Sequence, residues 1–214
     1  MMKLTNYDFA SIILIVVMFA ISFYMYPSLP DQIPIHWNAS GQVDGWGAPQ
    51  TIFLFPVIVA LVYGLFLAIP KIAVYKKNIQ DFKHFESMKF MLIVFLSAFY
   101  LATLFATQGY DFKMNYVFMP AIALLLLYFG YIMKDMKRNY FIGIRTPWTL
   151  ASDHVWKKTH ELGGKVFVKL GILMLMGVFV PAKYMLWFIL LPILVAVGIM
   201  IVYSYIIWKR EGKN

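Results

Sequence analysis

The chain has 214 residues, of which 62% are hydrophobic and 14% are charged, and its formal net charge is +9. A soluble domain of this length cannot bury so much apolar surface, so the composition excludes an ordinary globular protein and indicates an integral membrane protein. The sequence has no cysteine, which excludes a disulfide framework and thiol-based metal or redox chemistry.

Six apolar stretches are candidate membrane spans, because a helix needs about 20 apolar residues to cross a bilayer. They are residues 9–26, 51–69, 90–107, 116–133, 166–180 and 184–208. The first lacks a small-residue cleavage site, so we interpret it as a retained helix. The fifth is short and reaches the interface only if Lys165 or Lys169 extends its ammonium group toward water. The sequence therefore predicts an all-α integral membrane protein with six transmembrane helices.

Positive charge is unevenly divided between the two sides of this topology. Of the nineteen lysines and arginines, seventeen fall on one side, and only Lys113 and Lys183 fall on the other. The positive-inside rule then predicts a multi-pass protein with its N- and C-termini in the cytoplasm. The same charge favours contact with anionic membrane lipids and requires no direct binding to nucleic acid.

The connector after the first span, residues 27–46, lies on the outer side and contains no lysine or arginine. The run from Ile33 to Trp37 alternates as in a short strand, and Gly41 can supply the positive φ of a turn. Asp44-Gly45 predicts a second turn. We therefore expect a small extracellular β-hairpin-like loop.

His36 and Asp44 in this loop allow two interpretations. A neutral imidazole and a carboxylate can hold a metal or another ligand. We favour a structural role, in which His36 hydrogen-bonds the turn and Asp44 caps the Asp-Gly bend, and we expect no metal and no cofactor. Trp37 and Trp46 are expected at the level of the outer headgroups.

The spans and the inner connectors suggest an internal order. Each even-numbered span places a proline near its outer end and a lysine 15, 14 or 17 residues later. This spacing favours three copies of a two-helix unit over convergent composition. For the second connector, residues 76–86, two roles are open: an interfacial edge built on Phe82 and Phe85, or a solvated charged connector, which we favour.

A polar and aromatic segment runs from Asn139 to Gly164, inside the inner connector 134–165. Gly143 and Pro147 argue against a helix in its first part, and Pro147 favours an extended Thr146. From Thr149 or Ser152 onward, an apolar stripe predicts a short helix that Gly163-Gly164 would end. The stripe consists of Trp148, Val155, Trp156, Thr159 and Leu162. Such a helix suits a membrane surface, with Trp148 and Trp156 as anchors, or the end of its own bundle, and both interpretations are open.

The run NYFIGIRTPWTL at residues 139–150, followed by VWKKTH at 155–160 and Gly163-Gly164, resembles the bacterial SdpI membrane family. The outer loop resembles the pattern of an uncharacterised domain often found at the front of that family. The matching positions are Ile33, Pro34, His36, Trp37, Asn38, Gly41, Asp44 and Gly45. The family is named for an immunity protein against a secreted sporulation-delaying killing peptide.

The resemblance implies a protein of the bacterial cell membrane that gives resistance to a secreted membrane-active peptide toxin. In the best-known member of the family, the toxin-engaged protein also signals by holding a cytoplasmic transcriptional repressor at the membrane. We divide the chain accordingly into an N-terminal two-helix unit with the hairpin loop, residues 1–78, and a four-helix SdpI-like unit, residues 79–214.

Two candidate functional regions follow from the resemblance. The toxin-facing outer loop comprises His36, Trp37, Asn38, Gly41, Asp44 and Gly45. The inner region, which would meet a cytoplasmic repressor or a lipid headgroup, comprises Asn139, Gly143, Arg145, Thr146, Pro147, Trp148, Trp156, His160 and Gly163. The guanidinium of Arg145 suits a phosphate or a carboxylate, so it binds a headgroup, binds an acidic partner surface, or braces the loop against Asp135 or Asp153.

Two other functions stay open as alternatives. No acidic residue lies in a predicted span core and no lysine or arginine lies at mid-bilayer depth, which argues against a small-solute or lipid transporter. His154 and His160 lack the i, i+4 spacing of a helical zinc pair, so we expect them to be solvated or interfacial. A membrane enzyme acting on lipid or peptide would have to use His36 and Asp44, or Asp153 and His154. We expect no catalytic residue and no enzyme activity.

Overall fold

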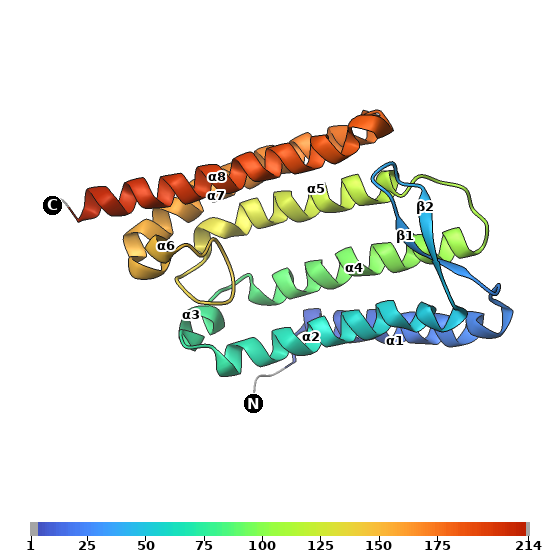
Figure 1. The fold of residues 1–214 in the computed structure, drawn as a ribbon. Helices are drawn as coiled ribbons and strands as arrows, with labels where there is room; N and C mark the ends of the chain where they lie inside the picture. Colours follow the sequence, from blue (N-terminus) through green and yellow to red (C-terminus); the bar gives the residue numbers. More distant parts are fainter. Residues whose placement is uncertain (1–3, 213–214) are drawn as a thin grey trace.

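The computed structural model describes residues 4–212 and is mostly helical (Figure 1). Six of its helices are long and apolar enough to cross a membrane, which confirms the predicted fold class. They are α1 (Asn6–Met25), α2 (Leu54–Ile72), α4 (Phe85–Thr107), α5 (Asn115–Ile132), α7 (Asp153–Leu175) and α8 (Met185–Glu211). The remaining α-helices and strands are α3 (Lys76–Gln80), α6 (Pro147–Ala151), β1 (Ile33–Trp37) and β2 (Val43–Gly47), and short 3-10 turns lie next to several of the long helices.

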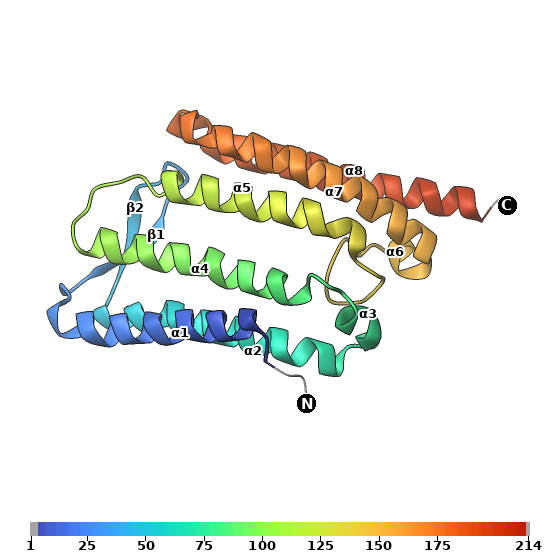
Figure 2. The ribbon, with the colours of Figure 1, turned by 180° about the vertical axis from the view of Figure 1, so that it is seen from behind.

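The six long helices lie side by side in two groups of three (Figures 1 and 2). One group contains α1, α2 and α4, and the other contains α5, α7 and α8, with α4 packed against α5 where the groups meet. Apolar clusters fill each group, around Val59 and Ile93 in the first and around Met119 and Met174 in the second. Many large apolar side chains of α8 stay exposed, as expected for a helix that faces lipid.

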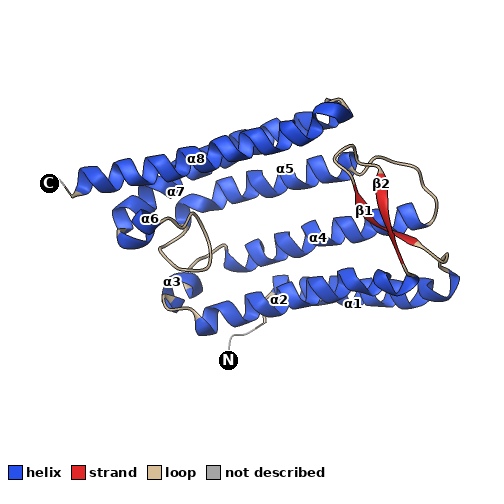
Figure 3. Ribbon diagram, viewed as in Figure 1, coloured by secondary structure: helices blue, strands red, loops and turns tan. Residues whose placement is uncertain are grey.

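The two ends of the bundle differ in structure (Figure 3). The strands β1 and β2 lie across one end, which we call the hairpin end. The short helices α3 and α6 and the irregular segment before α6 lie at the other end, and the two ends of the described chain lie toward it, so we call it the termini end (Figure 1). The segment 136–151 at the termini end contains the first part of the polar and aromatic run singled out by the sequence, and the start of α7 contains the rest.

The structure corrects the prediction for residues 149–180. Gly163-Gly164 do not end a short helix, because α7 runs without interruption from Asp153 to Leu175. A methyl group on Gly164 would lie 2.7 Å from the carbonyl oxygen of Gly130 on α5, so the two helix backbones nearly touch. Small residues allow such close approach between membrane helices, and this packing outweighs the weak helix propensity of glycine. The predicted basic helix and the predicted fifth span are therefore one element.

The connector between α2 and α4 is also corrected. The predicted solvated charged connector is wrong, because Ile79, Phe82 and Phe85 are all buried. They join an apolar cluster with Met133 and Met136, at the end of α5. The charged residues of the connector face outward because its apolar side chains cover the termini end of the bundle.

Candidate functional site

The hairpin is held to the bundle through its turn. Gly41 has φ +77°, and its carbonyl accepts a hydrogen bond of 2.9 Å from the backbone N–H of Met114, next to the start of α5. The side-chain oxygen of Asn38 accepts from the N–H groups of Ser40 and Gln42, at 2.9 and 3.2 Å. A β-carbon on Gly41 would lie 2.9 Å from the backbone nitrogen of Asn115. The predicted hairpin and its Gly41 turn are thus confirmed, and the turn docks on α5.

The predicted second turn at Asp44-Gly45 is wrong, because both residues lie within β2. Gly45 pairs with His36 across the strands, and a side chain there would collide with that histidine. His36 and Asp44 do not cap a turn either. The Nδ1 atom of His36 lies 2.5 Å from a carboxylate oxygen of Asp44, in a solvent-exposed cross-strand pair. Among residues 4–212 this pair belongs to no group of three or more possible metal ligands.

A cavity of about 510 Å³ opens beneath the hairpin. Phe55, Phe99 and Phe118 give it an aromatic wall, and three residues at the start of α8 give it an aliphatic side. Those three residues are Leu186, Ile189 and Leu190. Trp37, Asn38 and His36 on the hairpin also line the cavity, whereas Trp46 on β2 does not and is 55% exposed. An apolar cavity with a few polar groups at its edge suits an amphipathic ligand.

At the termini end, Asn139 folds the first part of segment 136–151. Its side chain is buried, and its oxygen accepts hydrogen bonds from the N–H groups of Phe141 and Ile142, at 2.8 and 2.7 Å. The side-chain NH₂ of Asn139 donates to the carbonyl of Lys137 at 2.9 Å. An asparagine that satisfies the backbone in this way replaces the hydrogen bonds that a helix or strand would supply.

Trp156 and His160 on α7 form hydrogen bonds that hold the rest of segment 136–151 in place. The indole N–H of Trp156 donates to the carbonyl of Met136 at 2.8 Å, and the ring stacks on His160 with a centroid distance of 4.0 Å. Nε2 of His160 accepts the N–H of Ile144 at 3.0 Å, so its Nδ1 carries the proton and donates to the carbonyl of Trp156 at 2.8 Å. Gly143 has φ +107°, and a β-carbon there would collide with His160.

These contacts decide between the two open interpretations of the basic helix. Trp156 and His160 are 2% and 1% exposed, so neither a membrane-surface anchor at Trp156 nor a solvated His160 is correct. Gly163 is buried as well, and a side chain on it would collide with Ile144. The start of α7 packs on the end of its own bundle, because this is where segment 136–151 finds its hydrogen-bond partners.

Thr146 and Pro147 begin α6. Thr146 is extended, at φ −107° and ψ 163°, as predicted from the proline that follows it, and its hydroxyl caps the helix by accepting the N–H of Thr149 at 3.2 Å. The same hydroxyl donates to Ser204 of α8 at 3.0 Å. Trp148, in the first turn, packs on Tyr205 of α8 with ring centroids 5.1 Å apart. Ser152 caps α7, so the capping role expected for Thr149 or Ser152 falls to Ser152.

Arg145 is exposed, and its guanidinium donates to the carbonyl of Tyr140. It does not brace the loop against Asp135 or Asp153, as one interpretation proposed. Asp135 pairs with Lys83 and His84, each at 3.1 Å. Asp153 pairs with Arg138 at 2.9 Å. Arg138, rather than Arg145, ties the segment to α7, and Arg145 is left at the surface.

The structure also contains a buried charged cluster that sequence reasoning missed. The ammonium of Lys89, in α4, is fully buried and lies 2.5 Å from carboxylate oxygens of both Asp8 and Glu86. Asp8, in α1, is 2% exposed and accepts hydrogen bonds from the hydroxyl of Tyr63 at 3.0 Å and from Thr5 at 2.8 Å. The predicted spans 9–26 and 90–107 leave Asp8 and Lys89 just outside the membrane-crossing stretches, but both residues lie inside spanning helices. The Thr5-to-Asp8 capping spacing and the Glu86-to-Lys89 spacing were the only local signals of this cluster.

The apolar helices, the docked hairpin and the ordered segment at the termini end define a polytopic α-helical membrane protein. Residues 135–205 match the SdpI/YfhL protein family, and residues 13–60 match a domain of unknown function, DUF1648. The match to the SdpI/YfhL family model confirms the resemblance inferred from the sequence. The first match includes segment 136–151 and α7, and the second includes the hairpin.

A search of characterised proteins finds a relative along most of the chain. The immunity protein SdpI of Bacillus subtilis (strain 168) is 28% identical over 180 residues, which cover 82% of this chain and 83% of the relative. No solved structure matches the chain. The similarity thus extends over both groups of helices and does not stop at the family segment.

Proposed function

We propose that this chain is a membrane immunity protein that protects its cell against a secreted, membrane-active peptide toxin, and that the toxin binds in the cavity under the hairpin. The cavity supports this proposal because it is apolar, aromatic and open, and because a turn fixed to α5 holds the hairpin over it. The similarity to an immunity protein over most of the chain supports the same function. The proposal assigns the chain no catalytic step.

The orientation that the proposal requires is the one predicted from charge. Seventeen of the nineteen lysines and arginines belong to the side that holds the termini, and the positive-inside rule then supports a hairpin that faces the outside of the cell. Leu186 and Leu190 line the cavity and are themselves exposed on α8. A peptide inserted in the outer leaflet can therefore reach the cavity sideways, burying its apolar side chains against the phenylalanines while the hairpin covers it.

The two hairpin tryptophans provide a matched test. Trp37 lines the cavity and Trp46 does not, although both lie in the same small sheet. In a strain that lacks its own immunity protein, we expect Trp37→Ala to lower survival under the sporulation-delaying killing peptide by about tenfold or more, because a tryptophan at a binding site often supplies much of the affinity. We expect Trp46→Ala to protect like the parent. The measurement is the viable count at equal amounts of membrane protein.

Labelling provides the control for orientation. The chain has no cysteine, so a single cysteine at Ser40 reports on the hairpin and one at Ser152 on the start of α7. An impermeant thiol reagent should label only the first in intact cells. Labelling of Ser152 alone, or equal protection by both tryptophan variants, contradicts toxin binding at an outward-facing hairpin cavity.

We further infer that segment 136–151 binds a cytoplasmic repressor protein when the toxin is bound. The segment is more ordered than a linker needs to be, because its backbone is hydrogen-bonded to the buried side chains of Asn139, Trp156 and His160. This rigid frame leaves the Arg145 side chain exposed. An exposed guanidinium on a rigid loop is suited to a carboxylate of a protein partner, since its planar fork donates two parallel hydrogen bonds.

Arg145 is tested against a second exposed arginine, Arg210 of α8. In a strain that carries the repressor of the relative's system and a reporter gene under its control, we expect Arg145→Gln to reduce the toxin-induced signal by about tenfold, because a charge-assisted hydrogen bond is lost. Arg210→Gln should signal like the parent. Arg145→Lys separates charge from geometry: recovery of the signal means that charge suffices, and loss means that the fork is required. A full signal from Arg145→Gln with full protection contradicts a role of this side chain in recruitment.

A further inference from the structure

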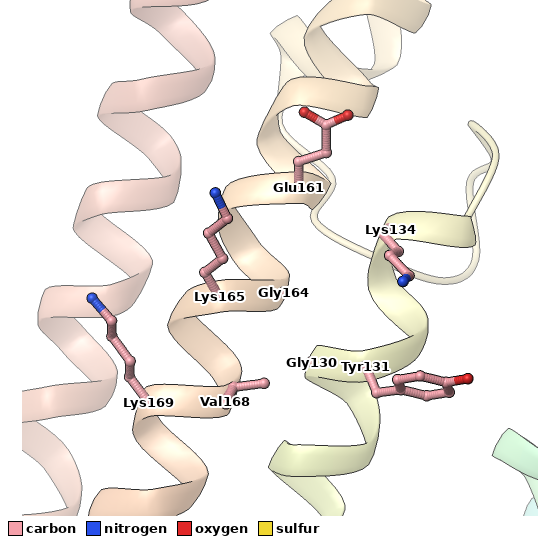
Figure 4. Close-up of a pocket in the computed structure, with 8 residues that line it drawn as sticks. All are labelled: Gly130, Tyr131, Lys134, Glu161, Gly164, Lys165, Val168 and Lys169. Atoms are coloured by element: carbon pink, nitrogen blue, oxygen red, sulfur yellow. The ribbon is translucent and has the colours of Figure 1, made fainter.

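A groove separates α5 and α7 near the termini end of the bundle. It has a volume of about 560 Å³, and its floor lies where Gly130 and Gly164 meet. Because neither glycine has a side chain, the two backbones come together and leave a depression, with Tyr131 on one side and Val168 on the other (Figure 4). Lys134, Glu161, Lys165 and Lys169 complete the lining.

Three lysines border the groove. Lys134 follows α5, and Lys165 and Lys169 lie one turn apart on α7, with both ammonium groups directed toward the Glu161 end of the helix (Figure 4). All three are exposed, and within residues 4–212 none of them forms an ion pair. Lys169 lies inside the apolar stretch of a spanning helix. A lysine in that position is costly unless its ammonium reaches the headgroup layer or meets an anion.

Two further interactions determine the charge balance of the groove. Glu161 is the only carboxylate in its lining, and it lies 3.3 Å from the ammonium of Lys158, which is not part of the lining. Lys134 lies over the ring of Tyr131 at 5.7 Å, a contact that leaves its charge free for an anion. The groove therefore has an excess of positive charge at its rim and an apolar wall below it.

We propose that this groove binds an anionic phospholipid, with its phosphate between the lysines and an acyl chain along Val168 and Tyr131. Ammonium groups are suitable partners for a phosphate diester, and they are placed where a lipid phosphate lies if α5 and α7 cross the bilayer. A zwitterionic headgroup would bring a cation to a site that already has three. The proposal does not depend on toxin immunity, because it requires only a membrane that contains anionic lipid.

The test uses the purified full-length chain in detergent and counts bound lipid by native mass spectrometry. The probes are phosphatidylglycerol and phosphatidylcholine of identical acyl chains. We expect Lys165→Gln/Lys169→Gln to weaken phosphatidylglycerol binding by about fivefold for each lysine removed, and to leave phosphatidylcholine binding unchanged. Lys134→Gln, on the other helix, should weaken it by about fivefold, so the result does not depend on one variant folding well.

Charge-matched controls separate the groove from the general surface charge. The double variant Lys157→Gln/Lys209→Gln removes two charges and Lys137→Gln removes one, as the groove variants do, but at exposed positions outside the lining. Both controls should bind phosphatidylglycerol as tightly as the parent. Equal weakening in groove and control variants, or equal affinity of the parent for the two lipids, overturns the proposal. Displacement of the lipid by millimolar inorganic phosphate also overturns it, because the groove would then be a site for a free anion.

Discussion

Replacing Lys89 with methionine is expected to destabilise the folded protein by about 3–5 kcal/mol, because the substitution leaves the buried carboxylate of Asp8 without its cation. The ammonium of Lys89 contacts Asp8 on α1 and Glu86 on its own helix, and the lysine side chain is fully buried. Asp8 keeps its hydrogen bonds from Tyr63 and Thr5, which do not replace a full charge. Unfolding of the purified protein in mixed detergent micelles measures the difference.

Two further variants show whether the buried pair is the cause. Asp8→Asn/Lys89→Met removes both charges and should recover much of the stability, since replacing both members of a buried pair is often close to neutral. Lys83→Met removes a lysine that is 67% exposed and pairs with Asp135, and a pair of that kind contributes about 0–1 kcal/mol. If Lys89→Met and Lys83→Met unfold alike, the cluster does not hold α1 to α4.

Replacing Gly164 with alanine is expected to cost about 1–3 kcal/mol, although alanine is the better helix former. The added methyl group would lie 2.7 Å from the carbonyl oxygen of Gly130 and could be accommodated only if α5 and α7 moved apart. The α5–α7 contact forms much of the second helix group, so the separation should weaken the whole group. The same unfolding measurement applies.

Gly198 provides the matched control for this substitution. It lies within α8, and a β-carbon on it would have no neighbouring atom within 4 Å. We therefore expect Gly198→Ala to be neutral or to stabilise the protein by up to about 1 kcal/mol through helix propensity alone. A Gly164→Ala protein as stable as Gly198→Ala would show that the two backbones can separate at little cost.

Several features of the fold were predictable because their causes are local. Five of the six spanning helices are apolar over about 20 consecutive residues, so their transfer free energy identifies them without reference to their neighbours. Gly41 and Pro147 restrict or permit backbone conformations at their own positions. The positive φ predicted for Gly41 and the extended conformation predicted for Thr146, before Pro147, are both confirmed. The family segment was recognisable for a similar reason, because the run around Arg145 is continuous in sequence.

The errors arose where distant residues determine a local structure. Gly163-Gly164 would end an isolated helix, but contact with Gly130 makes them interior positions of α7. The pattern around Trp156 and Lys157 predicts an amphipathic helix at the membrane surface, but the indole of Trp156 is buried and donates a hydrogen bond to the carbonyl of Met136. The short fifth span and the solvated connector were wrong for the same reason. In each case, packing that is absent from the sequence window supplied more free energy than the local preference.

The sequence by itself determined that this protein crosses a membrane, where five of its six spanning helices lie, which connector forms a hairpin and which segment resembles the SdpI/YfhL family. These properties follow from hydropathy, turn chemistry and continuous motifs. Only the tertiary structure decided that Asp8 neutralises Lys89, that the hairpin covers a cavity reaching α8, and that Lys134, just after α5, shares one groove with lysines of α7. Each of these sites joins helices far apart in the chain, so it exists only after packing has brought their side chains together.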